Sequence, residues 1–321
     1  MGTTRGREDL RTVQHTFSSM ATTVEIQICN PYPSKSDAID HIEQVFARVE
    51  AACTRFDPNS PLMRANNRPA DWHVVPDECL EAIAAAANAH HITGGLFDPR
   101  VLTSLVANGY DSTLPFRTGG VQLHARSSPP PPLDIENAWS PDIDVARRAV
   151  RLGDHPIDLG GIGKSYAVMR VASFFTGTDT SFLINAGGDC YAEGTGPAGD
   201  GWLIGVEDPA SESDPLAVLR VVGGGCATSS TRLRRWQVDG RDTHHLVDPR
   251  SGRAGGHGLT AVTVIAKDTM AAETWTKALF LSGPKEIAAY AEVHQLAALW
   301  VDTSGRVGVS PQMVPHIEWC P

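Results

Sequence analysis

Apolar and polar residues alternate near the start of the chain, in the way that a strand with one buried face requires. Val24, Ile26 and Ile28 fall on one face of this segment, and Glu25 and Gln27 fall on the other. The alternation begins near residue 15. It predicts the first strand of a sheet.

Helical spacing of apolar residues follows this strand. Between residues 37 and 52, Ile39, Ile42, Phe46 and Val49 recur at intervals of three or four residues. The pattern also predicts helices at residues 81–90, 165–175 and 270–281, and strands at residues 181–185, 202–206, 217–222 and 260–266. Helices and strands do not alternate as they would in repeated βαβ units. The pattern therefore predicts an α+β fold with mixed or antiparallel sheets and packed helices.

A polar, proline-rich stretch at residues 113–142 interrupts these elements and includes consecutive prolines at positions 129–132. We interpret it as a loop excursion or an insertion within a single domain that covers residues 14–310, and as the best candidate for a boundary between two lobes. The two lobes of this domain would comprise about residues 14–112 and 143–310. Residues 1–13 and 311–321 are interpreted as tails.

The composition restricts the class of ligand. The 321 residues carry a formal net charge of -10 and have a pI near 5.6. This argues against a nucleic-acid surface, because binding to a phosphate backbone requires a basic face. A small anionic ligand is still compatible with the charge.

Cysteine usage and the N-terminal residues indicate the cellular context. The six cysteines are scattered without a CxxC pair, so we expect buried thiols and neither a zinc site nor a redox dithiol. The first nine residues are polar, and no run reaches about 18 apolar residues. We therefore expect a cytoplasmic protein without a membrane anchor.

Residues 158–165 resemble a phosphate-binding P-loop, because a glycine turn leads into Gly163, Lys164 and Ser165. A P-loop needs glycine where this chain has Asp158, and a carboxylate at that position would repel phosphates. We instead expect a glycine turn that opens a helix at Ser165, whose N-terminus favours anions. A plain strand-to-helix turn is the alternative.

Two other short motifs carry little information alone. Gly187 and Gly188 follow an apolar strand and allow either a tight turn or close approach of a ligand to the backbone. His244 and His245 are adjacent, so on a strand they would point to opposite faces and make a poor metal pair.

The order of the motifs along the chain is more specific than any one of them. Eight segments, in sequence, resemble the ApbE family from about residue 14 to residue 310. They are residues 20–22, 54–57 with Asn66, 95–99, 158–165, 185–189, 202–209, 245–252 and the helix at residue 271. Members of that family bind FAD in a cleft between two lobes, coordinate Mg²⁺ at its diphosphate, and transfer FMN to a threonine or serine hydroxyl of an acceptor flavoprotein.

The resemblance implies a set of residues that contact the flavin nucleotide. These are Met20, Phe56, Asn66, Leu96, Phe97, Asp98, Asp158, Lys164, Gly187, Gly188 and Val247. It also implies a metal contact from Gly161, which could come only from its backbone carbonyl.

The helix near residue 271 departs from the family pattern. Where the family has a metal-binding aspartate and a threonine four residues later, this chain has Glu273 and Lys277. One explanation is that these residues form an i,i+4 ion pair in a metal site that has decayed. The other is that the Lys277 ammonium occupies the place of the cation and neutralises the diphosphate directly. A smaller departure is Ala21, where the family usually has glycine.

The implied reaction needs a base for the acceptor hydroxyl and positive charge near the diphosphate. Asp158 and His245 are the candidate bases, with Asp158 preferred, and Lys164 and Lys277 are the candidates for charge neutralisation. Two other activities are compatible with the same residues. One is FAD pyrophosphatase activity, with water in place of the acceptor, and the other is non-catalytic FAD binding.

Overall fold

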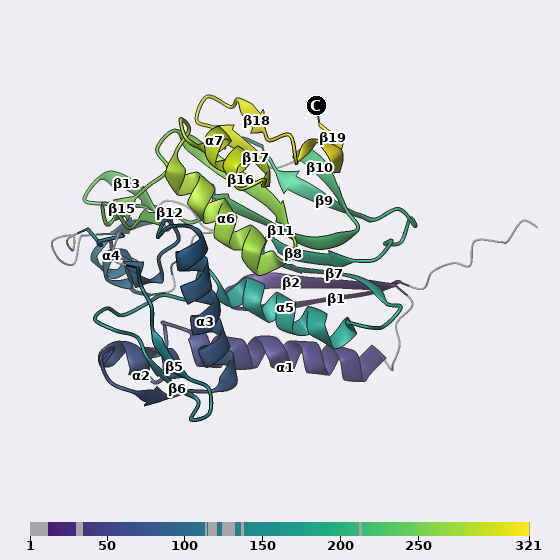
Figure 1. Ribbon diagram of the computed structural model, residues 1–321. Coiled ribbons are helices and arrows are strands. Elements are labelled where there is room, and N and C mark those ends of the chain that lie inside the picture. The colour runs from purple at the N-terminus through teal and green to yellow at the C-terminus, as the bar shows by residue number, and fades with distance from the viewer. Residues whose placement is uncertain are drawn as a thin grey trace, which may run out of the picture.

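A single eight-stranded antiparallel sheet organises the chain in the computed structural model (Figure 1). The structure describes residues 12–29, 35–112, 114, 121–123, 132–135, 138–211 and 214–320. In spatial order the strands are β1 (Thr12–Ser19), β2 (Thr22–Cys29), β7 (Ser181–Ala186), β8 (Asp189–Glu193), β11 (Gly223–Ser230), β16 (Leu259–Ala266), β17 (Ala297–Asp302) and β18 (Val307–Val309). Every pairing within this sheet is antiparallel.

The predicted first strand is in fact a hairpin of β1 and β2. Val24, Ile26 and Ile28 are buried as the alternation requires. The chain reverses at Met20 and Ala21, whose φ angles are 52° and 57°. Two residues with positive φ in succession make a two-residue hairpin turn, and this turn divides the alternating segment into two strands.

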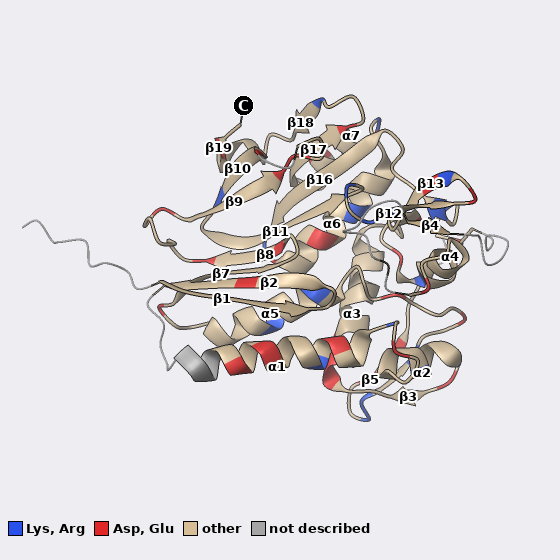
Figure 2. Cartoon of the chain, turned by 180° about the vertical axis from the view of Figure 1, so that it is seen from behind, with Lys and Arg blue, Asp and Glu red and all other residues tan. Residues whose placement is uncertain are grey.

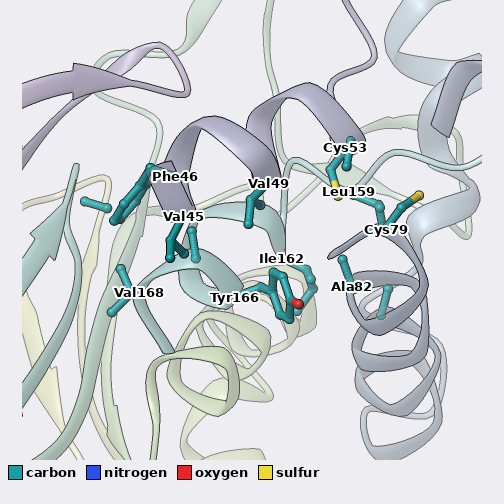
Figure 3. Packing of buried hydrophobic residues seen from close by; sticks show 14 of the residues in the cluster. Val45, Phe46, Val49, Cys53, Cys79, Ala82, Leu159, Ile162, Tyr166 and Val168 are labelled. Atoms are coloured by element: carbon teal, nitrogen blue, oxygen red, sulfur yellow. The ribbon is translucent and has the colours of Figure 1, made fainter. Parts of the chain in front are cut away.

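Three helices cover one face of the main sheet: α1 (Lys35–Cys53), α5 (Gly163–Phe175) and α6 (Thr269–Ser282) (Figure 1). A fourth helix, α3 (Asp77–Ile92), packs against these three helices. Figure 3 shows Phe46 and Val49 of α1 packed toward Ile162 and Tyr166 near the start of α5, and all four belong to the largest buried cluster. The short helix α7 (Ile287–Val293) packs against α6.

A second, three-stranded sheet packs on the opposite face of the main sheet. It contains β9 (Trp202–Glu207), β10 (Pro215–Val221) and β19 (Ile317–Trp319). Trp202 and Leu219 share a buried cluster with Cys226 and Leu299 of the main sheet. The segment interpreted as a C-terminal tail is therefore partly ordered by strand pairing, because β19 extends the edge of β10.

The remaining elements are short. They are α2 (Pro61–Asn67), η1 (Pro99–Val101), α4 (Leu102–Ala107), η3 (Val314–His316), and the strands β3 (His73–Val74), β4 (Gln122–Leu123), β5 (Asp142–Asp144), β6 (Ala149–Arg151), β12 (Arg235–Val238), β13 (Arg241–His244), β14 (Val247–Asp248) and β15 (Arg253–Ala254). β4 and β12 pair in parallel.

The predicted α+β class with packed helices and antiparallel sheets is confirmed. Predicted strands and helices recur with ends shifted by at most four residues. Strands from both predicted lobes share the main sheet, since β2 pairs with β7. Of the predicted excursion and the N-terminal tail, residues 1–11, 113, 115–120, 124–131 and 136–137 lie outside the described part of the chain.

Five of the six cysteines are buried free thiols, as predicted, and Cys320 is exposed. Among the described residues, no helix is both long enough and apolar enough to cross a membrane.

Candidate active site

A cleft of about 1060 Å³ opens where α6, the glycine-rich loop before α5 and the β1–β2 turn approach one another. It is lined by every residue predicted to bind the flavin nucleotide, to bind metal or to act in catalysis, except Asn66. These lining residues are Met20, Phe56, Leu96, Phe97, Asp98, Asp158, Gly161, Lys164, Gly187, Gly188, His245, Val247, Glu273 and Lys277. Segments spread over most of the chain thus meet in one place.

Lys164 and Asp189 form a buried ion pair in the floor of the cleft. Lys164 lies in the first turn of α5, and its Nζ donates to the Oδ2 atom of Asp189, the first residue of β8. The two residues are 9% and 2% exposed. At this depth each side chain exchanges its contacts with water for the contact with its partner.

A second ion pair joins two residues that are one helical turn apart on α6. Lys277 donates through Nζ to Oε1 of Glu273. Burial, followed by the negative charge of Asp189, raises the pKa of the Glu273 carboxyl, whereas Lys277 and Lys164 act in the opposite direction. These four charges therefore lie close enough to influence one another, and they alternate in sign. Figure 2 shows α5 and α6, which pack against each other, on the same side of the main sheet.

The glycine-rich loop is held tightly between α6 and Phe97. A Cβ atom on Gly161 would lie 3.0 Å from Cε of Lys277 and 3.0 Å from Cε2 of Phe97. The predicted helix begins at Gly163, two residues before the expected start. The absence of a side chain at residue 161 therefore brings the Lys277 side chain against the loop backbone.

Asp158 is anchored at the start of this loop. Its Oδ1 accepts from Gly160 N at 2.7 Å, and its own N–H donates to Pro99 O at 2.7 Å. Its Oδ2 lies 3.7 Å from Nε of Arg55. Both carboxylate oxygens thus face donors that the protein itself supplies.

His245 presents a neutral imidazole to the cleft. Its Nδ1 lies 3.3 Å from the carbonyl oxygen of Arg234 and donates to it, which leaves Nε2 as the acceptor. Burial, followed by the positive charges of Arg234 and Lys277, lowers the pKa of this imidazole well below its usual value. The ring is therefore neutral at neutral pH, with Nε2 unprotonated.

The two glycines after β7 differ in their surroundings. A Cβ atom on Gly187 would lie 2.1 Å from Oγ1 of Thr22, so the close approach is to the β1–β2 hairpin. A Cβ atom on Gly188 would meet nothing within 4 Å. Gly187 is therefore explained by the packing of the turn, and Gly188 by its φ of 97°.

The sequence model of the ApbE family matches residues 20–300 of this chain. The chain belongs to the ApbE family. A curated relative, the FAD:protein FMN transferase of Escherichia coli (strain K12), is 28% identical over 166 residues, which are 50% of this chain and 47% of the relative. The chain thus spans about half the length of this relative. The FAD:protein FMN transferase of Vibrio cholerae serotype O1 is 25% identical over 292 residues, 88% of this chain and 85% of the relative.

Solved structures agree with this chain in fold. The ApbE protein of Thermotoga maritima superposes with a TM-score of 0.78 at 24% identity, over 96% of this chain and 100% of that chain. The flavin transferase ApbE of Vibrio cholerae superposes with a TM-score of 0.77 at 20% identity, over 96% and 99% of the two chains. The arrangement of sheets and helices is therefore that of the ApbE fold.

Arg55 is a cleft residue of this ApbE chain that the sequence analysis did not single out. Its guanidinium carbon lies 4.2 Å from the ring centre of Phe56 and 4.4 Å from that of Tyr110, and its side chain is 5% exposed. Its Nη1 donates to Tyr110 O at 2.7 Å, whereas its buried Nη2 has no hydrogen-bond partner among the described residues. Arg55 lies within the segment that resembles the ApbE family, but no local pattern reveals that it is buried between two rings.

Two predicted contact residues direct their polar atoms elsewhere in the ApbE fold. Both Asp98 oxygens accept from the Arg100 side chain, at 2.7 to 3.1 Å, and the Asp98 side chain is 0% exposed. Asn66 lies outside the cleft lining. Its amide donates to Ile157 O at 2.8 Å and accepts from Ile157 N at 2.9 Å. Asn66 thus holds the backbone that leads into Asp158.

Replacement of Asn66 by alanine should lower the free energy of unfolding by about 2–3 kcal/mol, because it leaves a buried N–H and a buried carbonyl of Ile157 without partners. Urea denaturation of the purified variant measures this loss. Asn59→Ala, at an exposed position, should change stability by less than about 0.5 kcal/mol. A loss below about 1 kcal/mol in Asn66→Ala would show that this asparagine does not hold the loop.

Proposed function

We propose that this protein is an FAD:protein FMN transferase that moves FMN from FAD to a threonine or serine hydroxyl of an acceptor flavoprotein. The observation that carries the proposal is the convergence, in one cleft, of a neutral imidazole and two lysine ammonium groups. His245 is close enough to Lys277 for the ammonium to lower its pKa. Membership of the ApbE family and the names of its curated relatives support the same reaction.

The reaction is the attack of a hydroxyl on a phosphoanhydride. The acceptor oxygen forms a bond to the phosphorus of the FMN half, the bond from that phosphorus to the bridging oxygen breaks, and AMP leaves. Nε2 of His245 takes the hydroxyl proton. Lys164 and Lys277 face the negative charge that develops on the leaving oxygen.

We propose His245 as the base in place of Asp158, which the sequence analysis preferred. Oδ1 of Asp158 already accepts from Gly160, and Arg55 lies beside Oδ2. Nε2 of His245, in contrast, keeps its lone pair because Nδ1 is the atom that donates to Arg234. In this proposal Asp158 shapes the glycine-rich loop against the nucleotide.

The three activities compatible with the cleft differ in their products. Purified protein is incubated with FAD and with a candidate acceptor flavoprotein that carries an exposed threonine or serine. We expect one AMP released for each FMN joined to the acceptor, as measured by chromatography and intact-protein mass. FMN and AMP formed equally well without the acceptor would identify a pyrophosphatase. Bound FAD that is never cleaved would identify a non-catalytic binding protein.

A further inference from the structure

The ApbE resemblance implies a divalent cation near Gly161 and Glu273, and the residues present do not fit one. Mg²⁺ requires nearly octahedral oxygen ligands at about 2.0–2.1 Å. Oε1 of Glu273 holds the Lys277 ammonium, and Oε2 lies 3.3 Å from the oxygen of the Thr276 hydroxyl. Among the residues that the structure describes, no group of three or more His, Cys, Asp or Glu side chains is arranged to hold a metal ion.

Lys277 lies where the implied cation would be, between Gly161 and Glu273, and Lys164 lines the same cleft. Cε of Lys277 approaches the backbone of Gly161 so closely that a Cβ there would lie 3.0 Å away. Lys277 contacts Glu273 directly, and Lys164 lines the same cleft as both residues.

We infer that the ammonium group of Lys277, beside Lys164 in the same cleft, replaces the divalent cation as a binding partner of the FAD diphosphate, so that this site binds FAD without metal. The inference rests on the proposed function, because it concerns the substrate of that reaction. Each ammonium has three N–H donors, and its carboxylate partner needs one of them. The donors that remain can bind phosphate oxygens, and such charge-assisted hydrogen bonds are stronger than neutral ones.

The ion pair on α6 is not the exposed helix pair of a decayed site. The Lys277 and Glu273 side chains are 16% and 6% exposed. The Thr276 hydroxyl donates to the Glu273 carbonyl oxygen at 2.8 Å and accepts from Ser229 at 2.9 Å. The carboxylate is thus held in a buried network that fixes the ammonium against the glycine-rich loop.

The test is a titration of FAD, followed by flavin fluorescence, with Mg²⁺ or with excess chelator. Wild-type protein should show the same affinity, within about twofold, in both conditions. Lys277→Met keeps the apolar stem and removes the charge, and it should bind FAD about 10- to 100-fold more weakly. Lys285→Met, at an exposed position, is the matched control and should bind as wild type does.

Two further variants keep the test decisive if removal of one charge disturbs folding. Glu273→Gln with Lys277→Met leaves no unpaired charge and should show the same loss of affinity. Glu273→Asp with Lys277→Thr restores the pair of residue types that the family pattern has, and its FAD binding should become dependent on Mg²⁺.

Two results would overturn the inference: a chelator that weakens wild-type binding more than about tenfold, or an unchanged affinity in both variants that carry Lys277→Met. A wild-type protein that binds no FAD even with Mg²⁺ would instead contradict the proposed function. The two failures are therefore distinguishable.

Discussion

Replacement of His245 by asparagine is expected to slow FMN transfer by about 10²- to 10⁴-fold, the usual contribution of a general base. The asparagine amide can still donate to the carbonyl oxygen of Arg234, so the local hydrogen bond is kept while the proton acceptor is lost. FAD affinity should change much less than the rate. Single-turnover release of AMP at saturating FAD and acceptor measures the chemical step directly.

Asp158→Asn is the informative comparison for this variant. It removes the carboxylate charge beside Arg55 but keeps an oxygen that can accept from Gly160 N. If His245 is the base, the Asp158→Asn variant should retain more transferase activity than the His245→Asn variant. The opposite order, with wild-type turnover in His245→Asn, would return the role of base to Asp158.

Replacement of Lys164 by methionine should lower the free energy of unfolding by about 3–5 kcal/mol, because it leaves the Asp189 carboxylate buried without its partner. Asp189 is 2% exposed and already lies close enough to Glu273 to raise the pKa of that residue. The loss should therefore exceed that of any exposed ion pair. Urea denaturation followed by circular dichroism gives the value.

Two controls separate loss of the ion pair from loss of packing. Lys164→Met combined with Asp189→Asn removes both charges and should recover most of the stability. Arg68→Met, whose partner is Asp71 and whose side chain is 78% exposed, should cost less than about 1 kcal/mol. A similar small cost in Lys164→Met would mean that the buried pair contributes little to the folded state.

Elements in which apolar residues recur at regular spacing were predictable, because burial of one face requires that spacing. α1 and α6 show this, since their helical spacing matches the helices of the structure. β11 was missed because it begins with three glycines and shows no alternation. A Cβ atom on Gly225 would lie 2.2 Å from the backbone of Asp268 and Thr269. The backbone at the N-terminus of α6, some forty residues further along the chain, therefore leaves no room for a side chain at residue 225.

The lining of the site was predictable from the order of its motifs, but the hydrogen-bond partners of the lining residues were not. Asp98 and Asn66 have the polar groups that a ligand needs, yet Arg100 and Ile157 satisfy them. Arg55 is the converse case, since its position between two rings depends on Tyr110, far along the chain. Distances of this kind follow from the packed structure and from no local pattern.

The pairing of β2 with β7 has a consequence for how the chain is made. Residues 30–180 separate the two strands, so more than half of the protein is synthesised before the N-terminal hairpin meets its neighbour. At roughly 5–20 residues per second, translation of that interval takes roughly 10–30 s. Throughout this time the edge of β2 that will meet β7 has no partner strand, which leaves a row of unpaired N–H and C=O groups open to pairing with another chain.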